Sequence, residues 1–149
     1  AGMMISTKGR YALRVMIDLA EHDRLTFIPL KDIAKRQGIS EKYLESIVKI
    51  LTQAGILEGV RGKGGGYRLT QEPEHYTVGS ILKLTEVSLA PVDCLRCEPN
   101  VCPRTSECRT LPMWQDLYKL IDDFFEGITV ADLARQTAVE NKNSGPLSL

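Results

Sequence analysis

The feature that most limits the possible folds of this chain is a pair of short amphipathic segments followed by a glycine-rich hairpin. Residues 29–37 carry an apolar face and end at Gly38, which suits a left-handed helix C-cap. A second segment runs from Ser40, a suitable N-cap, to Gly55. Its apolar residues recur at helical spacing: Leu44, Ile47, Val48 and Leu51. Two helices joined by a glycine-containing turn are typical of a helix-turn-helix, although an ordinary helical hairpin shows the same pattern.

The next residues separate these two interpretations. Residues 56–60 and 67–70 are strand-like, and between them stands Arg-Gly-Lys-Gly-Gly-Gly, residues 61–66. Glycine allows positive φ at a hairpin tip, and Arg61 and Lys63 add two cations there. A hairpin of this kind after a helix-turn-helix predicts a winged helix. A nucleotide-binding P-loop is disfavoured, because that motif needs Gly-Lys-Ser/Thr feeding into a helix, whereas a strand follows here.

Further helices are expected on either side of this unit. Apolar spacing predicts them over residues 7–22, 78–86, 111–126 and 130–136. Their available N-caps include Ser6 or Thr7, Thr77 and Thr129. The fold class is therefore mainly α with a small β-wing (α+β), a winged helix-turn-helix plus a long C-terminal helix.

The long helix over residues 111–126 carries an apolar seam. Its members step by three and four residues: Trp114, Leu117, Ile121, Phe124 and Ile128. Such a seam suits packing against a helix of a second copy, and it equally fits a core face within one chain. On the first reading, the expected dimerisation residues are Trp114, Leu117, Ile121 and Phe124.

The expected domain division follows from these elements. The winged-helix DNA-binding domain is expected over residues 4–87 and a cysteine-rich loop over 88–110. The dimerisation helix and a short terminal helix follow over 111–137, and a disordered tail over 138–149.

Charge distribution indicates nucleic acid as a partner. The net charge is zero, but residues 1–72 hold 12 Lys and Arg against 8 Asp and Glu, and residues 73–149 hold 7 against 11. A basic front half and an acidic back half favour a nucleic-acid contact on one side, although a solvated helix surface produces similar asymmetry by chance.

On the winged-helix interpretation, the helix after Ser40 lies in the DNA major groove with its N-terminal residues facing base edges. The residues off its apolar stripe are Ser40, Lys42, Tyr43, Glu45, Ser46 and Lys49. Glu45 can accept from a cytosine amino group and Ser46 can donate or accept at several bases. Lys42, Lys49 and, on the first helix, Lys8 are expected on phosphates.

The wing completes the expected interface. Arg61, with Lys63 beside it, is placed to enter the adjacent minor groove. For each of these residues a solvated surface position is the alternative. Specific protein–DNA interfaces bury roughly 1,000–2,500 Å² of protein surface, more than one winged helix offers, so a symmetric dimer on double-stranded operator DNA is expected.

All four cysteines fall in one loop, with the spacing Cys94-x2-Cys97-x4-Cys102-x5-Cys108. Clustered thiols in a reducing, cytoplasmic compartment are typical of a metal or redox site. Only the first two form the close pair that structural zinc prefers, so the spacing favours an iron–sulfur cluster over zinc. A disulfide, inert thiols, or a small electron carrier using the first pair remain alternatives, but no βαβ pattern surrounds that pair.

The motifs together resemble a known family. Ile-Ser-x-x-Tyr-Leu-Glu over residues 39–45, Val-Arg-Gly-x-Gly-Gly-Gly-Tyr-x-Leu over residues 60–69, the cysteine loop and Trp-x-x-Leu over residues 114–117 are similar to the Rrf-two-type bacterial regulators. Within that family they resemble the iron–sulfur branch of IscR, NsrR and RirA. The resemblance covers about residues 4–136. It implies a homodimeric winged-helix transcription regulator, expected to be a repressor, that senses iron, cluster, redox or nitric oxide status.

The resemblance also implies specific residue roles. It implies DNA contacts at Ser40, Glu45, Ser46 and Arg61, and a [2Fe–2S] or [4Fe–4S] cluster on Cys94, Cys102 and Cys108. The family's positions for a fourth ligand hold Leu111 and Arg10 here. Cys97, a residue of the partner subunit or an exogenous small molecule is therefore expected to complete the site.

Other function classes find little support in the sequence. No run approaches 18 apolar residues and no N-terminal signal segment is recognisable, so neither a membrane span nor secretion is expected. No Ser/His/Asp or paired-carboxylate arrangement stands out, and the two histidines, His22 and His75, are expected at the surface. No enzymatic activity is therefore predicted.

Overall fold

The computed structural model describes residues 5–95 and 108–136. The predicted ligands Cys97 and Cys102 and the predicted tail over residues 138–149 lie outside this described part. Within it, the chain is mainly helical with one small antiparallel sheet, so the predicted fold class is confirmed.

Three helices form the centre of the winged helix: α1 (Thr7–Ala20), α2 (Leu30–Gln37) and α3 (Glu41–Gln53). The predicted local signals set their ends. The Ser6 hydroxyl accepts from the Gly9 N–H at 3.0 Å, and the Ser40 hydroxyl accepts from the Tyr43 N–H at 3.1 Å. Gly38 closes α2 in the left-handed conformation with φ 65°.

The wing is a hairpin of β1 (Leu57–Val60) and β2 (Gly66–Leu69), with Leu57 opposite Leu69. A segment before α2 joins its edge, because Ile28 and Tyr67 exchange two backbone hydrogen bonds of 2.9 Å. This approach requires glycine at position 66, where a Cβ would lie 2.2 Å from the Ile28 carbonyl oxygen. The sequence pattern did not predict this third strand-like segment.

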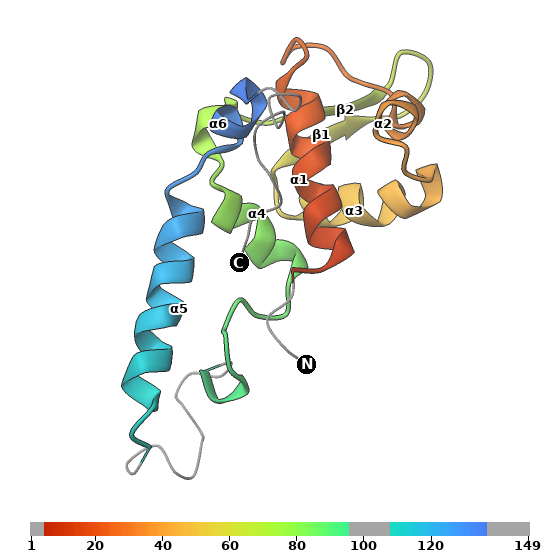
Figure 1. Ribbon diagram of the computed structural model, residues 1–149. Coiled ribbons are helices and arrows are strands. Elements are labelled where there is room, and N and C mark those ends of the chain that lie inside the picture. Colours follow the sequence, from red (N-terminus) through yellow and green to blue (C-terminus); the bar gives the residue numbers. More distant parts are fainter. Residues whose placement is uncertain (1–4, 96–107, 137–149) are drawn as a thin grey trace, which may run out of the picture.

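The remaining elements follow the wing: η1 (Pro73–His75), α4 (Val78–Thr85), η2 (Asp93–Leu95), α5 (Leu111–Glu126) and α6 (Val130–Arg135). Figure 1 shows α5 standing along one side of the molecule, beyond α4, while α6 returns to the end of the winged helix near η1. Thr129 and Asp132 form the capping box that starts α6. An antiparallel bridge between Thr77 and Thr129 joins the start of α4 to the start of α6.

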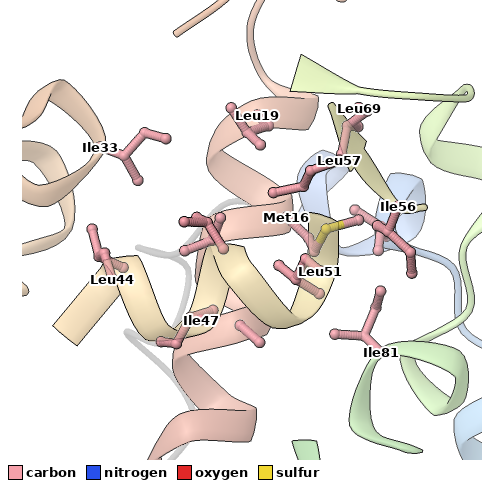
Figure 2. Close-up of a cluster of buried hydrophobic side chains, with 14 of the residues drawn as sticks. Met16, Leu19, Ile33, Leu44, Ile47, Leu51, Ile56, Leu57, Leu69 and Ile81 are labelled. Carbon is pink, nitrogen blue, oxygen red and sulfur yellow. The ribbon is translucent and has the colours of Figure 1, made fainter. Parts of the chain in front are cut away.

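Two hydrophobic clusters hold these elements together. The main core draws on α1, α2, α3, both strands and α4, whose side chains converge in Figure 2. Val130 of α6 is fully buried in the same core, so the last helix belongs to the winged helix in space. The second cluster joins α4 to α5 through Val78, Leu82 and Leu89, with Tyr118 and Phe125 packed against them.

Among the helices of the described residues, none combines the length and apolarity needed to cross a bilayer.

Candidate nucleic-acid interface

A groove runs between α3 and the wing on the surface of the winged helix. It has a volume of about 330 Å³ and is lined by residues of both elements: Glu45, Lys49, Thr52, Gln53, Gly59, Val60, Arg61 and Tyr67. Three of the predicted DNA-binding residues, Glu45, Lys49 and Arg61, therefore come together on one surface. A groove that carries cations from a helix and a β-hairpin offers charge to a phosphate backbone and side chains to base edges.

The predicted recognition residues of α3 differ in how far they are available. Lys42, Glu45 and Lys49 are exposed. Ser40 and Ser46 are also exposed, but Ser40 caps α3 and the Ser46 hydroxyl donates to the Tyr43 carbonyl oxygen at 2.7 Å. A serine hydroxyl has one proton and two acceptor lone pairs, so both keep hydrogen-bonding capacity for another partner.

Tyr43 plays a different part from the other residues off the apolar stripe. It is half-buried, and its ring meets the ring of Tyr11 edge to face, with centroids 5.7 Å apart. The Arg14 guanidinium lies 5.1 Å from the centroid of the Tyr11 ring. Aromatic pairs of this geometry contribute about 0.5–1.5 kcal/mol beyond the area they bury. Tyr43 thus fastens the first turn of α3 to α1.

A second group of contacts fastens α1 to the last turn of α2. Asp18 is 2% exposed, and its carboxylate accepts two hydrogen bonds from Arg36 at 2.8 and 3.0 Å and one from the Gln37 amide at 2.9 Å. Arg14 donates to the Gln37 backbone carbonyl at the end of α2. Tyr11, Arg14 and Asp18 lie on one face of α1, so this face holds both helices of the helix-turn-helix.

The ionisation of Asp18 reflects these contacts. Burial by itself raises the pKa of a carboxyl group, but the hydrogen bonds from Arg36 and Gln37 and the Arg36 charge outweigh burial and lower the pKa of Asp18 below 3.8. The same pair raises the pKa of Arg36. Both groups are therefore charged at neutral pH.

The cations outside α3 stand at separate places. Arg61 and Lys63 are exposed at the wing, where Gly62 and Gly64 adopt positive φ of 92° and 78°. These angles match the expectation that the tip needs glycine. Lys8 is half-exposed in the first turn of α1.

The cysteine loop is described at its two ends. Cys94 lies in η2 and Cys108 lies three residues before α5, and both are half-exposed. The Cys108 sulfur lies 3.4 Å from the Thr110 hydroxyl. Within the described residues no three His, Cys, Asp or Glu side chains gather into a metal-binding group, and two of the four predicted ligands fall outside that part. Two accessible thiols, one at each end of the loop, suit a soft metal or an iron–sulfur cluster.

Helix α5 has two apolar faces. Its inner face, with Tyr118, Phe125 and the following Ile128, packs on α4. Its outer face is exposed in a single chain: Met113 53%, Leu117 36%, Leu120 66% and Phe124 64%. Of the predicted dimerisation residues, Leu117 and Phe124 belong to this outer face, and Trp114 and Ile121 are half-buried. Helical spacing did not single out Met113 and Leu120, although they continue the same steps of three and four residues.

Three further residues that line the groove were not predicted. Thr52 and Gln53 line the groove near the end of α3, and Tyr67 lines it from the wing. Their only sequence signals are polarity next to a predicted recognition helix and the aromatic ring at the start of a strand. The sequence pattern does not indicate that the end of α3 lies against the wing, which only the folded structure shows.

Comparisons with known proteins extend over nearly the whole chain. A family model described as Rrf2, iron-dependent transcriptional regulator, matches residues 5–136. The HTH-type transcriptional regulator IscR of Vibrio campbellii (strain ATCC BAA-1116) is 38% identical over 138 residues, covering 92% of this chain and 80% of that protein.

Solved structures are similar as well. CymR (YrzC), the global cysteine regulator of B. subtilis, has a TM-score of 0.72 at 35% identity and covers 90% of this chain and 98% of its own. IscR of T. potens has a TM-score of 0.69 at 36% identity, with coverage of 89% and 86%. At this coverage the similarity includes α5 as well as the winged helix.

Proposed function

The chain belongs to the Rrf2 family of transcriptional regulators, and on this premise we propose that it binds operator DNA as a homodimer and reports iron–sulfur or redox status through its cysteine loop. As a member of this family it is a regulator of transcription and not an enzyme. The single observation that carries the DNA-binding part is the groove between α3 and the wing, where Glu45, Lys49 and Arg61 meet.

We assign the residues of this surface according to their chemistry and exposure. Ser40, Glu45 and Ser46 face base edges in the major groove, because their short polar groups discriminate between bases. The lysines Lys8, Lys42, Lys49 and Lys63 neutralise phosphates. Arg61 enters the minor groove from the wing, where the negative potential favours arginine. Tyr43 holds α3 against Tyr11 and thereby orients the helix.

The outer face of α5 supports the homodimer. Contiguous exposed apolar side chains on a soluble protein are typical of an interaction surface. Leu120 and Phe124 of this face also line an apolar pocket of about 230 Å³ together with Ile5 and Leu89. In a symmetric dimer, the same face of both subunits is covered at once.

We assign the cluster to Cys94, Cys102 and Cys108, with Cys97 as the candidate fourth ligand. When bound, an iron–sulfur cluster supplies a centre whose oxidation state and integrity respond to iron and oxidants. The chain fastens both ends of the loop to its folded part, since Leu89 and Ala90 are buried before Cys94 and Leu111 is buried after Cys108. A change in the loop's conformation therefore acts on the exit of α4 and on the start of α5.

DNA binding is tested by titrating a duplex selected from a random library at several salt concentrations. Phosphate neutralisation predicts a linear fall of log K with log salt, and Arg61→Ala is expected to weaken binding by about 1–3 kcal/mol. Lys119→Ala, on the opposite part of the molecule, is the matched control and is expected to bind like the unaltered chain. Affinity that is independent of salt and of Arg61 would refute the proposal.

The cluster is tested by anaerobic purification followed by visible absorbance and by iron and sulfide analysis. A coloured protein with both elements is expected, and Cys102→Ser and Cys108→Ser are each expected to lose the colour. Ser substitution at Cys97 resolves whether it is the fourth ligand. A colourless protein with stoichiometric zinc, whose DNA affinity does not respond to iron, would contradict the iron–sulfur assignment.

A thiol-based regulator is the second candidate, and similarity to CymR, a cysteine regulator, together with the half-exposed Cys94 and Cys108 favours it. Thiol groups that are accessible at a loop can react with oxidants. This candidate predicts an iron-free protein whose DNA affinity changes on treatment with peroxide and recovers with a thiol reductant.

A further inference from the structure

Helices α4 and α5 are joined by a compact group of charged side chains. The Lys83 ammonium lies 2.7 Å from an Asp122 carboxylate oxygen and 2.9 Å from Glu126 Oε1. The other Glu126 oxygen accepts from the Thr77 hydroxyl at 2.9 Å. Contacts thus occur at both ends of α4, at its N-cap Thr77 and in its last turn at Lys83. We call Lys83, Asp122 and Glu126 the α4–α5 clasp.

The backbone of α4 leaves room for this clasp. A Cβ at Gly79 would lie 2.3 Å from Glu126 Oε1 and 2.9 Å from its carboxyl carbon. Gly79 is helical, so its role is the close approach of the Glu126 side chain rather than an unusual φ. A carboxylate beside the first turn of a helix also interacts favourably with the partial positive charge of the N–H groups there.

Other contacts near the clasp hold α5 beside α4 but do not fix the angle between the two helices. The Val78 N–H donates to the Ile128 carbonyl and the Val130 N–H donates to the Tyr76 carbonyl, both at 2.8 Å. These bonds fasten the chain just beyond the end of α5. Apolar packing of Tyr118 and Phe125 on α4 is non-directional. Together with the Thr77 hydroxyl bond to Glu126, the clasp contacts α4 at its N-cap and in its last turn, and contacts at two points along a helix restrict its rotation where one contact does not.

Resting on the proposed DNA-binding homodimer, we infer that the α4–α5 clasp sets the angle between the winged helix and the dimerisation helix, and so selects the half-site spacing that the dimer accepts. Its three members are positioning residues, since none of them lies in the α3–wing groove. At about 13 Å from the joint, the radius of gyration of a domain of this size class, a rotation of about 15° moves an atom by about 3.4 Å, the rise of one base pair. A small change in the angle between α4 and α5 therefore shifts the positions of the two winged helices of a dimer along one duplex.

The exposure of the clasp agrees with an orienting role. The three side chains are 38 to 48% exposed. Ion pairs in such surroundings add little to folding stability, because water competes for both charges. Loss of the clasp should therefore leave the fold and the dimer intact while loosening their relative orientation.

The chain offers a matched pair of variants. Lys83→Glu reverses the charge in the clasp and repels Asp122 and Glu126. Lys119→Glu makes the same charge change on α5, but Lys119 pairs with Asp123 one turn along the same helix, at 2.7 Å. The double variant Lys83→Glu with Asp122→Lys restores an opposite-charge pair between α4 and α5. Glu126→Gln keeps the side-chain shape and serves if Lys83→Glu folds poorly.

The experiment measures affinity for duplexes that carry the two selected half-sites at spacings varied one base pair at a time. The unaltered chain and Lys119→Glu are expected to show one sharp optimum, with binding weaker by about tenfold at one base pair away. Lys83→Glu is expected to flatten this preference to about threefold or less, or to move the optimum. The double variant is expected to recover it. Sedimentation should show dimers throughout.

The outcomes separate this inference from the proposed function. A dimeric Lys83→Glu or Glu126→Gln variant with the spacing profile of the unaltered chain would overturn the clasp while leaving DNA binding in place. An unaltered chain that binds no duplex, or binds only as a monomer, would refute the proposed function and the clasp with it.

Discussion

Two ion-pair networks in this molecule have opposite surroundings. Within the winged helix, Asp18 is 2% exposed and its carboxylate accepts hydrogen bonds from Arg36 and Gln37. At the joint with α5, Lys83 meets Asp122 and Glu126 in side chains that are 38 to 48% exposed. Removing one member of a buried pair leaves an uncompensated charge, whereas water replaces a lost partner at the surface. Loss of an ion-pair partner is therefore expected to cost more stability within the winged helix than between α4 and α5.

The largest contrast is expected from apolar truncations. Leu51 is fully buried in the main core, so Leu51→Ala should lower the free energy of unfolding by about 2–5 kcal/mol through lost burial and a residual cavity. Leu120→Ala on the outer face of α5 should change monomer stability by less than about 0.5 kcal/mol. Urea denaturation checks the first value, and sedimentation checks whether Leu120→Ala weakens the proposed dimer. Equal destabilisation by both would break the comparison.

The buried network comes next. Asp18→Asn keeps the shape of the side chain but removes the charge that faces Arg36. We expect a loss of about 2–3 kcal/mol, below the roughly 3–5 kcal/mol of a fully buried pair, because the Arg36 side chain is 39% exposed. Thermal and urea unfolding measure it. Asp123→Asn, which affects only the exposed pair with Lys119, is the control and should stay within about 0.5 kcal/mol.

Acid should remove part of the same contribution. The pKa of Asp18 lies below its ordinary 3.8 in the folded chain, so the unfolded chain binds the proton more readily. The stability from this group is thus present above about pH 4 and disappears as the pH falls through the lower folded value. The difference in unfolding free energy between the unaltered chain and Asp18→Asn should shrink over that window. A difference that stays constant down to pH 2.5 would contradict this account.

The smallest effect on folding stability is expected for the ion pairs between α4 and α5. Lys83→Met should change the unfolding free energy by less than about 1 kcal/mol, because both ion pairs are exposed and screened by salt. Above the ordinary Glu pKa of 4.5, Glu126 is charged, because hydrogen bonds from Lys83 and Thr77 lower its pKa. A loss as large as that of Asp18→Asn would remove the distinction between the two networks.

Much of the winged helix was predictable because its signals are local. Ser6, Ser40, Thr77 and Thr129 start helices where the sequence indicates, and Gly38 ends one, so most helix bounds agree within two residues. Asp18 was not predicted, since the partners of its carboxylate come from residues 36 and 37 on another helix. Local pattern describes a helix's faces but not which neighbour covers them.

Helix α5 shows the same limit more clearly. Its apolar band is wide enough for two faces. The predicted seam holds Leu117 and Phe124 of the outer face together with the half-buried Trp114 and Ile121. Periodicity locates the centre of such a band, while only the position of α4 divides it into an inner and an outer face. Met113 and Leu120 were missed for that reason.

The bridge between Thr77 and Thr129 has a consequence for how this chain tolerates change. Because Ile81 of α4 and Val130 of α6 both belong to the main core, the cysteine loop and α5 form an insertion within the winged helix, and the Thr77–Thr129 bridge fastens the returning chain beside the start of α4. The entropy of closing such a loop rises slowly with length, by about 0.6 kcal/mol for each doubling. Insertions or deletions between the buried residues Ala90 and Leu111 are therefore inexpensive for the winged helix. The cysteine loop is therefore free to vary in length and cysteine spacing while the winged helix keeps its shape.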